Sequence, residues 1–317
     1  MAKDLLERLG EYRQVRLDTL SDDHVQRLSR TLQRLESEVV AVASQLPTRG
    51  GKLFQTRLAI ELRPKLKQLI EEYYLTPVAL TINDYDEIAG NIVATYGKLP
   101  VPEVFKQITE VDLTTIQQLK KFTYTQFEDL GNELVTTLSD ELYQSTLTGR
   151  STAEMITTLK GKINGIYQSS DNAEAQELVD FIANNPEKTE QVNTAVSRLQ
   201  TIYGSDRLGN NFQRYAGQLV QDSIMGFDGQ FAKYRADELG LTSYKYTGTT
   251  VRDSRDFCRR NVGMVFTTEE IDKIWSGSWT GKSSGNPFVV RGGYNCRHHW
   301  QPLNPDWVDA EGNYKLD

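Results

Sequence analysis

Hydrophobic spacing over the first 240 residues is the feature that most constrains the fold. The clearest example follows Ser21, a residue type that often caps the start of a helix. Apolar residues then recur at alternating steps of three and four until Pro47 ends the pattern. They are Val25, Leu28, Leu32, Leu35, Val39 and Val42. This spacing predicts a helix with one apolar seam over residues 21–46.

Two interpretations of this seam follow from its length. It covers nearly three heptads, fewer than a convincing coiled coil needs, so we favour a long helix of an antiparallel bundle. The alternative is self-association of the chain as a coiled coil through residues 21–46. His24 falls on the polar side of the seam, where we expect it to be solvent-exposed.

Similar periodicity predicts further helices, the first of them kinked or split by Pro64. They cover residues 53–75, 84–95, 113–147, 173–183, 187–203 and 210–239. Between them, Ser151 and Glu154 form a capping-box pattern that begins another helix. The last helix contains Gly226 and Gly229, which we expect to allow close approach of another helix.

The composition changes near the C-terminus. All four Trp and both Cys follow residue 250, and residues 251–317 carry equal numbers of acidic and basic side chains. The net charge of −7 therefore belongs to the preceding residues. We predict a mainly α protein, with an elongated helical region (residues 1–240, a bundle or extended helices) and a small α+β module (residues 241–317). No apolar run reaches the roughly 18 residues of a membrane span.

Short motifs follow one another in this C-terminal module. A β-rich stretch at residues 242–251 is followed by Asp253, Arg255, Cys258, a G-x-V-F segment beginning at Gly263, and a G-x-N-C-R segment. The last segment comprises Gly293, Asn295, Cys296 and Arg297, preceded by Gly292 and followed by His298 and His299. This order resembles the C-terminal module of the phage Mu F-like minor head proteins, also called phage head morphogenesis proteins. The resemblance covers about residues 240–303, and it departs from many relatives in having Arg297-His298 where they have a second Cys.

The resemblance implies a non-enzymatic virion protein present in few copies. Such proteins are made in the host cytoplasm during assembly and lie inside the head near the portal vertex. Their expected partners are the portal protein, the major capsid protein, or both, and in some phages they enter the host with the DNA.

The Cys and His residues suggest three kinds of chemistry. Cys258, Cys296, His298 and His299 offer the sulfur and nitrogen ligands that zinc prefers, although a CxxC knuckle is missing. A Cys258–Cys296 disulfide is a second option, disfavoured in a reducing cytoplasm. We favour the third, in which no cofactor is bound, the thiols behave as small apolar residues and the His side chains are hydrogen-bonded.

Several other residues of the module are expected to stabilise its fold. Asp253, Arg255 and Arg297 are expected to form a network that ties the strand to the G-x-N-C-R turn. Gly292, Gly293 and Asn295 suit a tight turn. The four Trp are expected to form the core of the module, since they supply large apolar area.

Nucleic acid offers a further set of interpretations. Arg252, Arg259 and Arg260 form a local basic patch that could make a weak contact with packaged DNA, but a neutral module on an acidic chain argues against strong binding. The enzymatic alternative is a metal-dependent, nuclease-like or DNA-processing activity using His298 or His299. The module lacks a clear second His downstream of this pair, which counts against that alternative.

Overall fold

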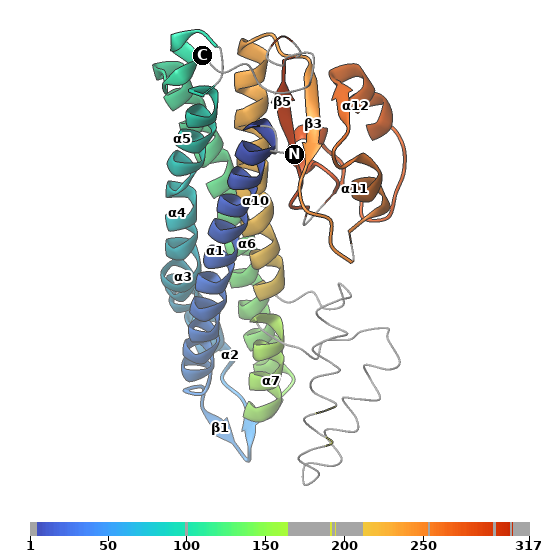
Figure 1. Ribbon diagram of the computed structural model, residues 1–317. Helices are drawn as coiled ribbons and strands as arrows, with labels where there is room; N and C mark the ends of the chain where they lie inside the picture. Colours follow the sequence, from blue (N-terminus) through green and yellow to red (C-terminus); the bar gives the residue numbers. More distant parts are fainter. Residues whose placement is uncertain are drawn as a thin grey trace. The chain divides into compact units, whose positions relative to one another are not determined.

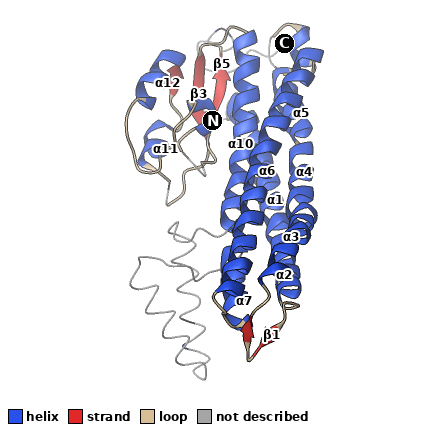
Figure 2. Cartoon of the chain, turned by 180° about the vertical axis from the view of Figure 1, so that it is seen from behind, coloured by secondary structure: helices blue, strands red, loops and turns tan. Residues whose placement is uncertain are grey.

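The computed structural model describes residues 5–98, 101–163, 191, 194, 212–252, 254–293, 296–304 and 306. Long helices make up most of these residues, and a small sheet lies near the C-terminus (Figures 1 and 2). The predicted class is therefore confirmed: the protein is mainly α with a small α+β C-terminal module. Among the described helices, none has the length and apolar character needed to cross a bilayer.

The chain divides into two compact units. Unit 1 comprises Met1–Gln26, Val78–Gln126 and Gln218–Asp317, whereas unit 2 comprises Arg27–Pro77 and Phe127–Gly217. Three long helices contribute residues to both units: α1 (Leu5–Ala43), α6 (Glu110–Leu147) and α10 (Phe212–Glu238). The C-terminal module belongs to unit 1 together with three earlier helical segments, and the boundary at residue 240 stays a prediction.

Unit 2 contains most of the predicted apolar seam. Its other elements are α2 (Thr56–Glu61), α3 (Arg63–Ile70), the π-helix η1 (Glu71–Leu75), α7 (Thr152–Ile163) and a hairpin of β1 (Thr48–Arg49) and β2 (Lys52–Leu53). The seam residues from Leu28 to Val42 are buried within the single chain. They pack inside the chain as the bundle interpretation expects, and self-association through residues 21–46 stays a prediction.

Two helix boundaries that were predicted from individual residues are confirmed, and one predicted boundary is wrong. Pro64 stands in the first turn of α3 and separates it from α2. The Ser151 hydroxyl accepts from the backbone N–H of Glu154, and the Glu154 carboxylate accepts in return from the Ser151 N–H. Ser21, however, does not begin a helix: it is buried in the middle of α1, because residues 5–20 continue the helix upstream.

Unit 1 holds the remaining helices and the three-stranded sheet. Before the sheet come α4 (Thr76–Asn83), α5 (Tyr85–Tyr96) and the 3₁₀ turn η2 (Glu103–Lys106). The module contains β3 (Ser243–Thr247), α11 (Asp256–Asn261), β4 (Val265–Thr267), α12 (Thr268–Trp275), α13 (Pro287–Val290) and β5 (His299–Leu303). The strand order is β4-β3-β5 with antiparallel pairing throughout. The central strand β3 lies within the predicted stretch 242–251, and α10 matches the helix predicted at residues 210–239. The helices predicted at residues 173–183 and 187–203 lie outside the described residues, apart from two positions.

His24 corrects an expectation of exposure. It is 2% exposed, and its ring nitrogens lie 2.8 Å from an Asp84 carboxylate oxygen and 3.0 Å from the Thr81 hydroxyl. The heptad pattern placed it on a polar face. That face is covered in unit 1 by α4 and the turn after it, which the pattern of one helix could not reveal.

The glycines of α10 serve close packing, as predicted, but against α13. A Cβ atom on Gly229 would lie 2.1 Å from the carbonyl oxygen of Phe288, and one on Gly226 would lie 3.4 Å from Val289 Cγ1. The backbone of α13 therefore rests on α10 at a distance that only glycine permits at position 229.

Gly229→Ala is expected to lower the free energy of unfolding by about 1–3 kcal/mol, because the added methyl must displace backbone. Gly90→Ala is the matched control: it lies inside α5, and its Cβ would meet nothing within 4 Å. The control should stabilise the protein by about 0.5–1 kcal/mol. Urea unfolding of both variants measures the difference, and equal stabilities would contradict the close approach.

Candidate functional site

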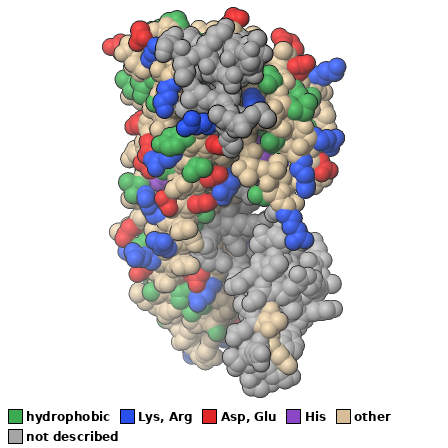
Figure 3. Space-filling view, in the orientation of Figure 1, with side chains coloured by type: hydrophobic (Ala, Val, Ile, Leu, Met, Phe, Trp, Pro, Cys, Tyr) green, Lys and Arg blue, Asp and Glu red, His purple; other side chains and the backbone are tan. Residues whose placement is uncertain are grey.

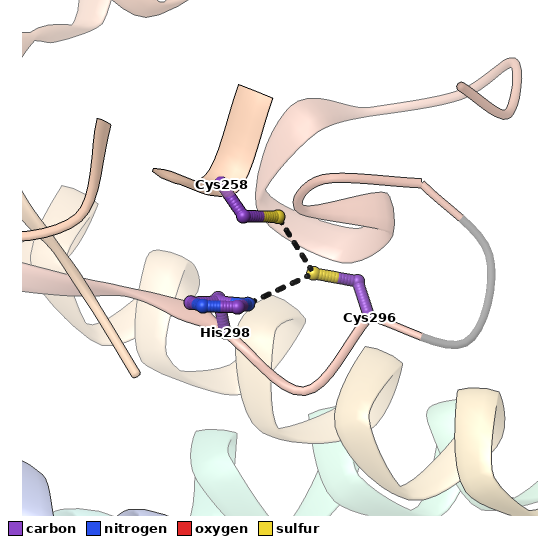
Figure 4. A group of neighbouring side chains, drawn as sticks. All are labelled: Cys258, Cys296 and His298. Atoms are coloured by element: carbon purple, nitrogen blue, oxygen red, sulfur yellow. Dashed lines mark hydrogen bonds between the residues drawn. The ribbon is translucent and has the colours of Figure 1, made fainter. Parts of the chain in front are cut away.

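The C-terminal module brings together three donor side chains from two segments of the chain. Cys258 comes from α11, Cys296 from the segment after α13, and His298 from the residue before β5 (Figure 4). Tyr246, on the central strand β3, faces the same point. Tyr246 pairs with Trp300 across β3 and β5, which brings the segment before β5 to this position.

The donor atoms are close together and buried. The two Sγ atoms lie 3.9 Å apart, and Cys296 Sγ lies 3.6 Å from His298 Nδ1. All three donor atoms lie within 4.8 Å of one another. The hydroxyl oxygen of Tyr246 is 3.5 Å from Cys258 Sγ and 3.6 Å from Cys296 Sγ. The two Cys, present as free thiols, are thus joined with a His and a Tyr in one polar cluster.

Glycine and aromatic rings shape the walls of the cluster. A Cβ on Gly292 would lie 2.6 Å from Cys258 Sγ and 3.1 Å from Cys296 Sγ, so this position must lack a side chain. The indole N–H of Trp279 donates to the Gly292 carbonyl at 2.9 Å, and the Trp279 ring stacks on Phe257 at 4.2 Å. The Tyr246 ring stacks on His298, with ring centroids 5.4 Å apart. The donors therefore lie in surroundings that are mostly apolar.

Hydrogen bonding shifts the pKa values of the two thiols in opposite directions. The bond to Cys296 raises the pKa of Cys258, and burial acts in the same direction. The bond from Cys258 lowers the pKa of Cys296 despite its burial, with a further contribution from His298. Cys296 is therefore the first of the pair to become a thiolate, while Cys258 keeps its proton and donates it.

His299 does not join the cluster, which corrects its inclusion in the predicted ligand set. Its Nδ1 donates to the Gln14 side-chain oxygen at 2.9 Å, and Gln14 donates in turn to Asp18 at 3.1 Å. The ring is 1% exposed. Burial lowers the pKa of His299 well below its usual value, and the positive charge of Arg13 adds to this effect. The imidazole is therefore neutral and acts as a donor to α1.

Arg297 also turns toward α1. Its guanidinium donates to both carboxylate oxygens of Asp22, the shorter contact being 2.7 Å, and lies 3.6 Å from Asp18. The predicted network of Asp253, Arg255 and Arg297 is not fully described by the structure, which pairs Arg297 with α1. Its other predicted members are Asp253, which lies outside the described residues, and Arg255, whose guanidinium packs against Gly281.

The predicted turn is partly described. Gly293 has φ +120°, and its Cβ would lie 2.0 Å from the Gly281 carbonyl oxygen. Gly263 has φ +85° in the turn that precedes β4, whereas Asn295 lies outside the described residues. Gly293 thus allows its loop to approach the loop of Gly281 closely, whereas at Gly263 it is the positive φ that favours glycine.

Two buried arginines near the cluster were not anticipated from the sequence. Arg291 is 2% exposed with φ +61°, donates to the Cys296 carbonyl at 3.0 Å and lies 3.6 Å from Asp222. Arg13 of α1 donates to Asp228 of α10 at 2.7 Å and to the Gln301 side-chain oxygen at 3.1 Å. The first holds the backbone at Cys296, and the second joins β5 to two helices of unit 1.

The predicted Trp core is described in part. Trp300 is buried and packs on Tyr246, whereas Trp275 and Trp279 are half-buried and contact each other. Trp307 lies outside the described residues.

The predicted basic patch is exposed, and two of its three guanidinium groups donate to backbone carbonyls of the module. Arg259 donates to the Arg252 carbonyl at 3.2 Å, and Arg260 donates to the Asp256 carbonyl at 3.3 Å. On the face drawn in Figure 3, basic and acidic side chains are interspersed over the described helices. Neither observation favours an extended surface for nucleic acid.

Comparison of the chain with protein families, curated proteins and solved structures finds no match. The resemblance to the phage Mu F-like minor head proteins therefore stays a prediction from the motif residues.

Removing one partner of the buried Arg13–Asp228 ion pair is expected to destabilise the folded protein. Both side chains are at most 5% exposed, so Asp228→Ala leaves a buried positive charge and should lower the free energy of unfolding by about 3–5 kcal/mol. Glu61→Ala is the control, because its partner Arg57 is 90% exposed, and should change stability by less than about 0.5 kcal/mol. Denaturant unfolding measures both; a small effect of Asp228→Ala would show that the pair adds little.

Burial of neutral His299 predicts acid sensitivity. Because its pKa is lower in the folded than in the unfolded chain, stability is fully present above about pH 6.5 and falls as the pH decreases from there. The expected slope is at most about 1.4 kcal/mol per pH unit. His299→Gln should remove this contribution, which unfolding between about pH 5.5 and 7.5 would measure against the wild-type chain. Parallel curves for the two proteins would contradict the prediction.

Proposed function

We propose that the chain is a non-enzymatic phage minor head protein that binds the portal, the inner capsid surface, or both during head assembly. The observation that carries the proposal is the ordered set of motif residues in the module. Cys258 lies far before Gly292, Cys296 and His298 in the sequence, and the four residues meet at one point beside β3. Because the motif residues pack on one another, their role in the fold of the module accounts for them. No role in binding a substrate is needed to explain the motif.

Burial of the histidines supports a structural role over the nuclease-like alternative. His298 is 6% exposed and His299 is 1% exposed. A general base must come within hydrogen-bonding distance of the water or hydroxyl that it activates. Neither ring presents a nitrogen to a DNA phosphate without rearrangement of the module.

Charge and exposure favour a protein partner. The net charge of −7 and the interspersed charges make the surface a poor match for DNA phosphates. On α6, Val111 and Phe122 are 60% and 61% exposed. Their spacing of eleven residues, about three helical turns, puts them on one face. Such a face offers apolar area to another protein.

A binding experiment with assembled particles tests the proposal. The tagged chain should be retained by portal rings or empty capsids of the phage that encodes it, and it should be present in mature particles. Phe122→Asp should weaken retention at least about tenfold, because a charge in an apolar contact must be desolvated. Gln117→Asp is the matched control, because it adds the same charge about 140° further around α6 and should bind normally.

Two results would oppose the proposal. Absence of the chain from mature particles, together with no retention by either assembly, would remove the minor head assignment. Metal-dependent DNA cleavage that is lost in His298→Ala and in His299→Ala would instead favour the enzymatic alternative. Normal retention of the Phe122→Asp variant would reject only the α6 face as the contact.

A further inference from the structure

Two distances between the buried donors match the edges of a zinc tetrahedron. Zinc bonds of about 2.3 Å to sulfur and about 2.0–2.1 Å to nitrogen place two sulfurs about 3.8 Å apart and a sulfur and a nitrogen about 3.6 Å apart. The Cys258 and Cys296 Sγ atoms are 3.9 Å apart, and Cys296 Sγ is 3.6 Å from His298 Nδ1. Two of the three donor–donor distances therefore match a zinc tetrahedron, and the third, between Cys258 and the His298 ring, is no longer than 4.8 Å (Figure 4).

The Tyr246 hydroxyl offers a fourth donor, which lies at tetrahedral distance from both sulfurs. An oxygen donor in the same tetrahedron would lie about 3.5 Å from each sulfur, if its bond to zinc is about 2.0 Å long. The Tyr246 hydroxyl oxygen lies 3.5 Å and 3.6 Å from the two sulfurs. It is fully buried on the central strand, so its position is set by the sheet.

Charge balance suits such an ion in this environment. Two thiolates and a neutral imidazole around Zn²⁺ sum to zero, which avoids the large cost of a buried net charge. A disulfide fits less well, because the sulfurs would have to approach from 3.9 Å to about 2.05 Å. Gly292 adds a further constraint, since its missing Cβ leaves room for both sulfurs.

We propose that Cys258, Cys296 and His298 bind a Zn²⁺ ion, with the Tyr246 hydroxyl at the fourth position. Binding releases the two thiol protons to solvent, and no oxidant or reductant is required. The ion fastens α11, the segment after α13 and the start of β5 to the central strand. All four positions are filled by protein, so the site is structural and independent of the proposed virion role.

Metal content of the full-length protein tests the site directly. Protein expressed with added zinc and dialysed against metal-free buffer should retain about one zinc ion per chain. Replacement with Co²⁺ should give the thiolate charge-transfer band and the intense visible bands of a tetrahedral site. Chelation of the metal should lower the Tm of the wild-type chain, because the ion binds only the folded site.

Single substitutions then identify the ligands. Cys258→Ser, Cys296→Ser and His298→Ala should each reduce zinc affinity at least about tenfold, and Tyr246→Phe by roughly 10- to 100-fold with a shifted cobalt spectrum. His299→Gln is the matched control, because it alters the adjacent buried imidazole that faces Gln14 and should keep full zinc content. Circular dichroism of each variant separates loss of metal from loss of fold.

Measurements on the wild-type protein test the zinc site even if the variants fail to fold. A folded wild-type chain that binds neither zinc nor cobalt overturns the proposal, as does a Cys258–Cys296 disulfide found by mass spectrometry of the freshly purified protein. Unchanged zinc affinity and an unchanged cobalt spectrum in Tyr246→Phe would overturn the assignment of Tyr246 as the fourth donor. Loss of portal binding with zinc retained would affect the proposed function alone.

Discussion

The pairing of β3 with β5 is the constraint on which the C-terminal module depends. Five residue pairs join residues 243–247 to residues 299–303, and about fifty residues lie between the two strands. Closing a loop of that length costs chain entropy, which the pairing must offset with help from burial of Tyr244, Tyr246 and Trp300. Once the strands are paired, the segment carrying Cys296 and His298 has little freedom. The donor cluster is thus a consequence of strand register, with α11 and its Cys258 packed onto the same aromatic core.

Local signals in the sequence predicted most of the helices and the class of the fold. Periodicity, Pro64 and the Ser151 capping box depend on neighbouring residues, and each is found where it was expected. Ser21 failed because its side chain suits a helix start, yet the upstream residues form helix equally well and the seam pattern does not report where a helix begins. His24 failed for a different reason: α4 and the following turn cover a face that looks polar in α1 alone.

The candidate site was predicted as a set of residue types but not as a geometry. The structure brings Cys258, Cys296 and His298 together. His299 points to a different face from His298, and that difference depends on strand register. Arg13 and Arg291 were missed because arginine is rarely buried and its partners, Asp228 and Asp222, are distant in sequence. Hydrophobic periodicity does not predict such ion pairs, because the two partners match in charge and lie on different elements.

The contacts of Arg13 and Gln14 with Gln301 and His299 have a consequence for synthesis on the ribosome. They join residues nearly 290 positions apart, so the first helix leaves the ribosome long before the strand that completes its polar contacts. Until then, two side chains that are buried in the finished protein remain hydrated, and the early part of α1 has an incomplete set of partners. A prematurely terminated chain would keep this segment exposed and accessible to chaperones and proteases. The polar contacts of Arg13 and Gln14 are therefore completed only after residue 301 has been synthesised.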